Sequence, residues 1–172
     1  MIEDKDQFHG VALSFLLLAL SEKKKFMSLI LNGESSSEYV LKIKKDKKDT
    51  FFKKKQEFLN IGLYVKYSTK RRTPWAYTFN RQHQEDIDKS FKKHATTFVI
   101  LINSNDGIVC LEYNEFRKIL DYNHEEAEGI RVSRRLKQSY RLTGRDGKLN
   151  HTIAPSSFPK KITEYVETFY EN

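Results

Sequence analysis

A short basic stretch in the first half of the chain gathers side chains that could bind phosphate. Lys66 ends a run of alternating apolar and polar residues. The triplet Lys70, Arg71 and Arg72 follows closely, and Trp75, the only tryptophan in the chain, comes next. Basic groups can neutralise phosphates, and an aromatic ring can stack on a base. The stretch therefore predicts contacts with nucleic acid; the alternative is a basic hairpin tip beside a core tryptophan.

A second group of basic side chains lies in the last third of the chain, around Tyr140. If its members alternate along two paired strands, several share one face and form a phosphate-binding stripe. Arg134 and Arg135 are the two that we expect to contact nucleic acid. The alternative is a solvated sheet face. The basic residues of this group are Arg131, Arg134, Arg135, Lys137 and Arg141.

The elements that must position these residues begin with a helix and two strands. Asp6–Ser21 is apolar nearly all round, which predicts a well-buried helix. Phe26–Leu31 and Glu38–Ile43 are expected to form strands, with a turn that starts at Asn32-Gly33. The charged run Lys44–Lys55 is expected to be a solvated loop or the start of a short helix.

The middle of the chain predicts a strand–helix–strand unit. In the strand Ile61–Tyr67, alternation separates an apolar face from one that carries Tyr64 and Lys66. Three further elements and a turn are expected after it. They are a helix from Asn80 or Arg81 to about His94, a central strand Thr97–Ile102, a turn at Asp106-Gly107 and a returning strand Ile108–Glu112.

The C-terminal part predicts small strands after a short helix over Tyr113–Leu120. The expected strands are Ile130–Ser133, Ser139–Thr143 and Lys148–Ile153, and a final helix covers Lys161–Tyr170. The fold class is therefore α/β, a mixed central sheet with flanking helices and a small C-terminal strand-rich extension. We expect a single domain over 1–172, with a core at 1–120 and the extension with its final helix at 121–172.

The order helix–strand–strand–strand–helix–strand over about Phe8–Ile102 resembles the PD-(D/E)XK, or restriction-endonuclease-like, superfamily. The resemblance implies an acid on the second strand and an E-x-K motif on the third, which together bind a divalent metal. The lysine of that motif helps to orient or activate the attacking water. Mg²⁺ takes hard oxygen ligands, so this chemistry needs carboxylates.

Carried over by position, the resemblance makes Glu38 the first acid and Lys66 the lysine. Tyr64 stands where the family has the acid of E-x-K, so the motif is degenerate. Some members move the lost carboxylate to the following helix, where Glu85 and Asp86 are candidates. The implied catalytic residues are then Lys66, Glu38 and Glu85, with Glu38 and Glu85 as ligands of Mg²⁺. Without catalysis, no cofactor is expected.

Composition favours a polyanionic partner. The 172 residues include 31 Lys+Arg and 23 Asp+Glu, a net charge of +8. The single cysteine, Cys110, lies in an apolar run, so we expect it to be buried and no intrachain disulfide to form. The acidic N-terminus and the absence of a long apolar run predict a cytoplasmic protein that does not span a membrane.

These observations favour a nucleic-acid-binding domain with a nuclease-like but degenerate core. The resemblance alone implies a context of DNA processing or defence, and DNA is favoured over RNA. One alternative is an active Mg²⁺-dependent endonuclease, and another is a protein–protein interaction module without nucleic acid. The sequence leaves open whether the chain has a protein partner or forms a homo-oligomer.

Overall fold

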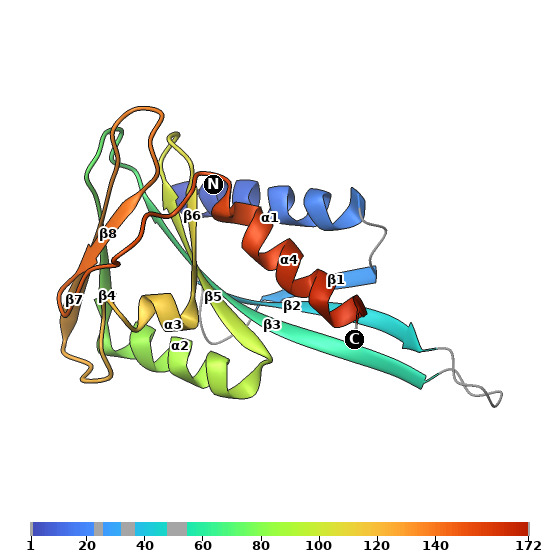
Figure 1. Ribbon diagram of the computed structural model, residues 1–172. Helices are drawn as coiled ribbons and strands as arrows, with labels where there is room; N and C mark the ends of the chain where they lie inside the picture. Colours follow the sequence, from blue (N-terminus) through green and yellow to red (C-terminus); the bar gives the residue numbers. More distant parts are fainter. Residues whose placement is uncertain (1, 23–25, 32–36, 48–54, 172) are drawn as a thin grey trace.

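The computed structural model describes residues 2–22, 26–31, 37–47 and 55–171 (Figure 1). Within them, a mixed five-stranded sheet has helices on both faces, and a smaller three-stranded sheet closes one end. None of the described helices has the length and apolarity needed to cross a membrane. The elements are α1 (Asp4–Glu22), β1 (Phe26–Leu31), β2 (Glu38–Lys47), β3 (Lys55–Ser68), β4 (Trp75–Asn80), α2 (Arg81–Lys93), β5 (Thr96–Asn103), β6 (Ile108–Glu112), α3 (Tyr113–Phe116), β7 (Ala127–Ser133), β8 (Arg141–Gly144) and α4 (Ser157–Glu171).

The main sheet has the order β1-β2-β3-β5-β6. β1, β2 and β3 form an antiparallel meander, β5 lies parallel to β3, and β6 returns antiparallel to β5. The connection from β3 to β5 runs through β4 and α2, because parallel neighbours need a crossover. β5 is buried almost throughout, as the apolar run in its sequence predicts for a central strand.

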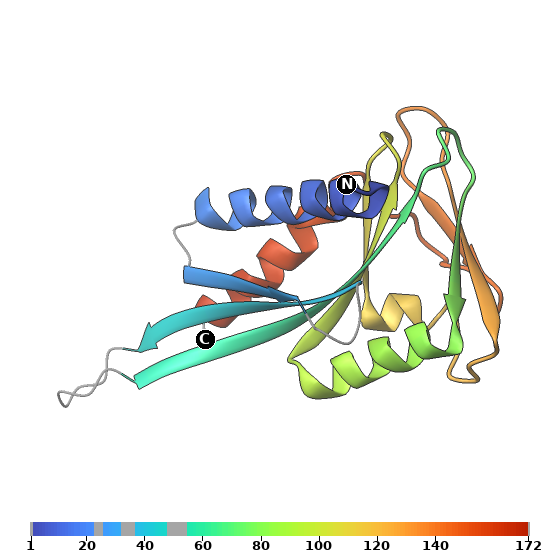
Figure 2. The same ribbon diagram turned by 180° about the vertical axis from the view of Figure 1, so that it is seen from behind.

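Alternation along β3 separates two hydrophobic cores. Ile61, Leu63 and Val65 belong to a core with α1 and α4, which lie side by side on one face of the sheet (Figures 1 and 2). Tyr64 belongs to a second core, which includes Ile87 of α2 and residues of the small sheet. The strand–helix–strand unit predicted from the sequence is confirmed, and its faces are assigned as expected.

The predicted C-terminal strands do not form a sheet of their own. β7 pairs with β4 on one side and with β8 on the other, so the small sheet takes one of its strands, β4, from the first half of the chain. The predicted strand Lys148–Ile153 is wrong: its ends make only isolated bridges, to Thr143 and Tyr140. Within this segment only Leu149 and Ile153 are buried, so it follows the sheet edge without joining it.

Two predictions for the N-terminal part also need correction. α1 is not buried all round, because it lies on the sheet surface and only one side of it meets the protein. Val11, Phe15 and Leu18 are 52%, 55% and 61% exposed.

The charged run Lys44–Lys55 was predicted to be a loop or the start of a helix, but both of its ends are strands. β2 extends to Lys47, and β3 begins at Lys55. The middle of this run, like the predicted turn at 32–33, lies outside the described residues.

The predicted hairpin between β5 and β6 is confirmed, but its tight turn spans Asn103–Asp106, where the N–H of Asp106 donates to the carbonyl of Asn103 at 2.9 Å, and Gly107 follows this turn. The backbone N–H of Asn103 donates to the carbonyl of Gly107 at 2.9 Å, and β5 and β6 pair on either side. Gly107 has φ +147°, and a Cβ atom there would lie 2.6 Å from the hydroxyl of Tyr140. Only glycine suits both conditions. Cys110, in β6, is fully buried as expected.

Candidate functional site

Glu38 and Lys66 lie on neighbouring strands and share one face of the main sheet, as the sequence predicts. Glu38 is paired with Tyr64 in the register between β2 and β3, and Lys66 follows Tyr64 by two residues. Residues two apart on a strand point to the same face. Glu38 and Tyr64 are buried, whereas Lys66 is partly exposed. The structure thus gathers an acid, a tyrosine and a lysine on this face.

Lys66 lies against an aromatic ring. Its Nζ is 5.1 Å from the ring centre of Phe79, which belongs to β4. Burial lowers the pKa of the Lys66 amine to about 8. In the described part of the chain, no hydrogen bond or ion pair joins this amine to another residue. Lys66 therefore offers a cation near neutral pH that also releases its proton more readily than an ordinary lysine.

His83 adds a second nitrogen base beside this group. The side chain of Asn80 accepts from the backbone N–H of His83 at 2.8 Å, and His83 Nδ1 accepts from the N–H of Asn80, so the two form a capping box. The capping box orients the imidazole ring. Burial and the charge of Lys66 lower the pKa of His83, against a smaller opposite effect of Asp86. Asp86 is thus the acid of α2 that lies close enough to influence this group.

Glu85 is placed differently from the prediction. It lies two residues from the buried Ile87, about 200° around the helix, and it pairs with Lys89 at 3.9 Å on the exposed side. The helical phase therefore keeps Glu85 from converging with Glu38 as a second Mg²⁺ ligand. Among the described residues, no group of three His, Cys, Asp or Glu could hold a metal ion.

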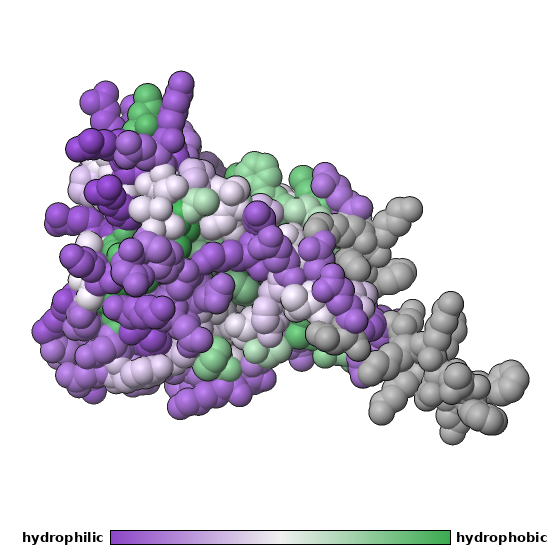
Figure 3. Space-filling model, in the orientation of Figure 1, coloured by the Kyte–Doolittle hydropathy of each residue, from purple (hydrophilic) through white to green (hydrophobic). Residues whose placement is uncertain are grey.

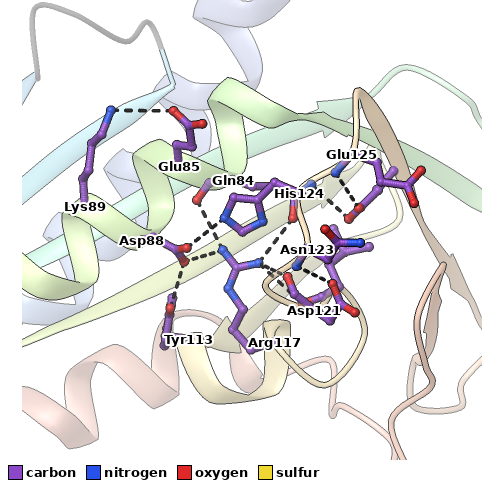
Figure 4. A network of polar contacts seen from close by, with 12 residues as sticks. Gln84, Glu85, Asp88, Lys89, Tyr113, Arg117, Asp121, Asn123, His124 and Glu125 are labelled. Atoms are coloured by element: carbon purple, nitrogen blue, oxygen red, sulfur yellow. Dashed lines mark hydrogen bonds and ion pairs between the residues drawn. The ribbon is translucent and has the colours of Figure 1, made fainter.

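A buried polar network fixes α2 and therefore His83 and Asp86 (Figure 4). Asp88 accepts from the hydroxyl of Tyr113 at 2.8 Å, contacts His124 Nε2 at 2.9 Å, and forms an ion pair with Arg117. Burial by itself raises the pKa of Asp88, but these hydrogen bonds outweigh it and hold that pKa below its usual value. No local pattern predicted this network, because its members lie on α2, at the end of α3 and in a loop.

The two predicted basic segments meet at one end of the molecule. The backbone N–H of Arg134 donates to Thr73 Oγ1 at 3.2 Å, which joins the β7–β8 turn to the loop over residues 69–74. Lys70, Arg71 and Arg72 in that loop are exposed. Figure 3 shows that the end of the molecule formed by the small sheet and these loops is largely hydrophilic.

The outer face of the small sheet continues this basic end. Burial alternates along β4 and β7, so every second residue points outward. The outward positions, all within the described residues, carry two arginines and no acid. They are Ala76, Thr78, Asn80, Ala127, Gly129, Arg131, Ser133, Arg141 and Thr143. Arg131 and Arg141 therefore share one face, as the sequence predicts.

Trp75 does not serve as a stacking platform in this structure. It is 1% exposed, packs edge-on against Tyr140, and donates from Nε1 to the carbonyl of Lys70 at 2.8 Å. Stacking on a base needs an exposed ring face. The assignment of Trp75 to nucleic-acid contact is therefore wrong. Its hydrogen bond to the Lys70 carbonyl holds the basic loop against the core.

Comparison with known proteins gives no match to this chain. No protein-family model, no curated protein and no solved structure is significantly similar to it.

We predict that the fluorescence of Trp75 reports a core residue. Because Trp75 is the only tryptophan, its emission can be read without labelling. The emission is expected to be blue-shifted and resistant to iodide, and to stay nearly unchanged when DNA is added. Strong iodide quenching of the folded protein, or strong quenching by DNA, would return Trp75 to the binding surface.

Replacing Lys66 with methionine is expected to stabilise the protein near neutral pH by about 1–2 kcal/mol, after a discount for partial exposure. The pKa of the Lys66 amine is about 8 in the folded chain and 10.5 in the unfolded chain, so folding opposes the charged form. Wild-type stability should therefore rise between these pH values, and the advantage of the variant should shrink over the same window.

Denaturant melts across that pH window measure the effect of Lys66→Met. The matched control is Lys42→Met, because Lys42 Nζ lies 4.2 Å from the ring centre of Phe58 on an open part of the same sheet face. We expect no stabilisation from the control. A less stable Lys66→Met variant near neutral pH would refute the assignment of a destabilising charge.

Proposed function

We propose that this chain binds nucleic acid through its basic end, on a nuclease-like core that lacks one acid of the metal site. The basic end consists of the exposed loop Lys70–Arg72, the β7–β8 turn with Arg134 and Arg135, and the outer face of the small sheet. The observation that carries the proposal is the contact between Arg134 and Thr73, since it unites two basic segments that lie far apart in the sequence.

The outer face of the small sheet suits the backbone of a nucleic acid. Most of its outward side chains are small, so a phosphate chain can approach the sheet closely. Arg131 and Arg141 supply positive charge, and no acid on this face repels a phosphate. Contacts of this kind give affinity with little sequence preference. A duplex or an extended single strand can use such a surface, and we favour DNA.

The core supports binding in preference to cleavage. What supports the nuclease-like part of the proposal is the element order from α1 to β5, in which β1, β2, β3 and β5 are successive neighbours in one sheet. The resemblance implies Glu38 as the first acid and Lys66 as the lysine, but Tyr64 stands where the E-x-K motif has its acid. A phenol is a weaker ligand for Mg²⁺ than a carboxylate, because this ion selects hard, charged oxygens. We therefore propose a binding domain derived from a nuclease-like architecture.

A mobility-shift assay with labelled duplex and single-stranded DNA tests the proposal, with Mg²⁺ or Mn²⁺ added in parallel. We expect binding that weakens steeply between about 50 and 200 mM salt and no cleavage. No shift with either DNA at the lower salt would overturn the proposal. Metal-dependent cleavage that disappears in both Glu38→Gln and Lys66→Met would establish the endonuclease instead.

A further inference from the structure

We propose that a pocket beside the β7–β8 turn binds a phosphomonoester dianion, as at the phosphorylated end of a nucleic-acid strand. The inference rests on the proposed function and names the part of the ligand that this pocket would take. The cavity has a volume of about 180 Å³, and none of the described residues in its walls carries a carboxylate. It is lined by Ser133, Arg134, Arg135, Gln138, Ser139 and Arg141.

The lining groups are of the kind that oxyanions require. Guanidinium, hydroxyl and amide groups all donate hydrogen bonds, and guanidinium groups bind phosphate oxygens in a bidentate manner. The side chains of Arg135 and Arg141 are exposed, and neither makes an ion pair or a side-chain hydrogen bond within the described part of the chain. Two arginines are therefore available for a ligand.

Arg134 is already held in place. Its Nε lies 2.6 Å from Asp106 Oδ2, a terminal nitrogen donates to the Asp106 carbonyl at 3.2 Å, and its guanidinium lies 4.7 Å from the ring centre of Tyr140. The hydroxyl of Tyr140 donates to the same carboxylate at 2.9 Å. The arginine that forms the inner wall is thus fixed before a ligand arrives, which reduces the entropic cost of binding.

The local charge favours a monoester over a diester. Three arginines against the single carboxylate of Asp106 leave a charge of +2 at the pocket. A phosphomonoester carries between about −1.5 and −2 near neutral pH, whereas a phosphodiester inside a strand carries a single negative charge. The hydrogen bond from Gln138 N–H to the carbonyl of Arg135 closes the turn that carries four of the lining residues.

The test compares oligonucleotides of one sequence that carry a 5′-phosphate, a 3′-phosphate or no terminal phosphate, with wild type and the double variant Arg135→Gln/Arg141→Gln. Arg134 is kept because of its contact with Asp106. The matched control is Arg131→Gln, which removes an exposed arginine from the same sheet face outside the pocket. Thermal melts with added inorganic phosphate, against chloride at equal ionic strength, test the pocket without DNA.

We expect wild type to bind one of the phosphorylated ends at least about tenfold more tightly than the unphosphorylated strand. The preference should disappear in the double variant and remain in Arg131→Gln, and phosphate should raise the melting temperature of wild type but not of the double variant. Equal binding of all three strands would overturn this inference and leave the proposed function intact. Stabilisation by phosphate without strand binding would assign the pocket to a free phosphorylated small molecule, and would overturn the proposed function instead.

Discussion

Replacing Asp88 with alanine is expected to lower the free energy of unfolding by about 3–5 kcal/mol. The change leaves the guanidinium of Arg117, whose side chain is 3% exposed, without its ion pair. It also removes the acceptor for the hydroxyl of Tyr113 and the partner of His124. A buried cation that loses its partner keeps its desolvation cost, and for this reason the loss exceeds that of a surface pair. Denaturant melts measure the difference.

The pH dependence of stability gives an independent check on Asp88. Because the folded-state pKa of Asp88 lies below its usual value, the carboxylate stabilises wild type above the unfolded pKa of 3.8, and the contribution is lost as the pH falls further. The alanine variant should lack this part of the acid dependence. Glu85→Ala on the same helix is the control, since its exposed pair with Lys89 is expected to contribute less than about 1 kcal/mol. Equal losses in the two variants would contradict the role of the network.

Replacing Lys70, Arg71 and Arg72 together with alanine is expected to weaken binding to duplex DNA by about 100-fold or more at low salt. All three side chains are exposed, and each can release a counterion from one phosphate. Three lost contacts would reduce the slope of log affinity against log salt by up to about 2.7. Fluorescence anisotropy titrations over a range of salt give both quantities.

A charge-matched control separates a specific surface from the overall positive charge. Lys89, Lys92 and Lys93 are exposed on α2, and their replacement with alanine removes the same charge. We expect the affinity of this control to stay close to wild type and the melting temperature of the loop variant to be nearly unchanged. Equal weakening by both triple variants would mean that binding follows net charge and not the basic end.

Local patterns in the sequence predicted the parts of the fold that depend on neighbouring residues. The alternation of Ile61–Tyr67, the start of a helix at Asn80 or Arg81 and the hairpin between β5 and β6 each depend on a few adjacent side chains, and all three occur in the structure. The shared face of Glu38 and Lys66 followed from the same alternation once β2 and β3 pair. These predictions needed no knowledge of how distant elements pack.

The features that the sequence left undetermined depend on tertiary contacts. The apolar composition of α1 does not say how much of the helix meets the sheet, and a single tryptophan such as Trp75 suits a core or a surface equally. One step along α2 decides that Asp86, and not Glu85, acts on the charge of His83. The pairing of Arg134 with Asp106 joins residues 28 apart and carries no local signal.

Amide hydrogen exchange with and without duplex DNA locates the bound surface without a mutation. Binding through the basic end should slow exchange in residues 69–74 and 131–144, which form the basic loop, the β7–β8 turn and the strands beside it. Residues of α1 and α4, which cover the face of the main sheet opposite α2, should exchange at the same rate with and without DNA. Protection confined to those helices, or absent throughout at a DNA concentration that saturates binding, would rule out binding through the basic end.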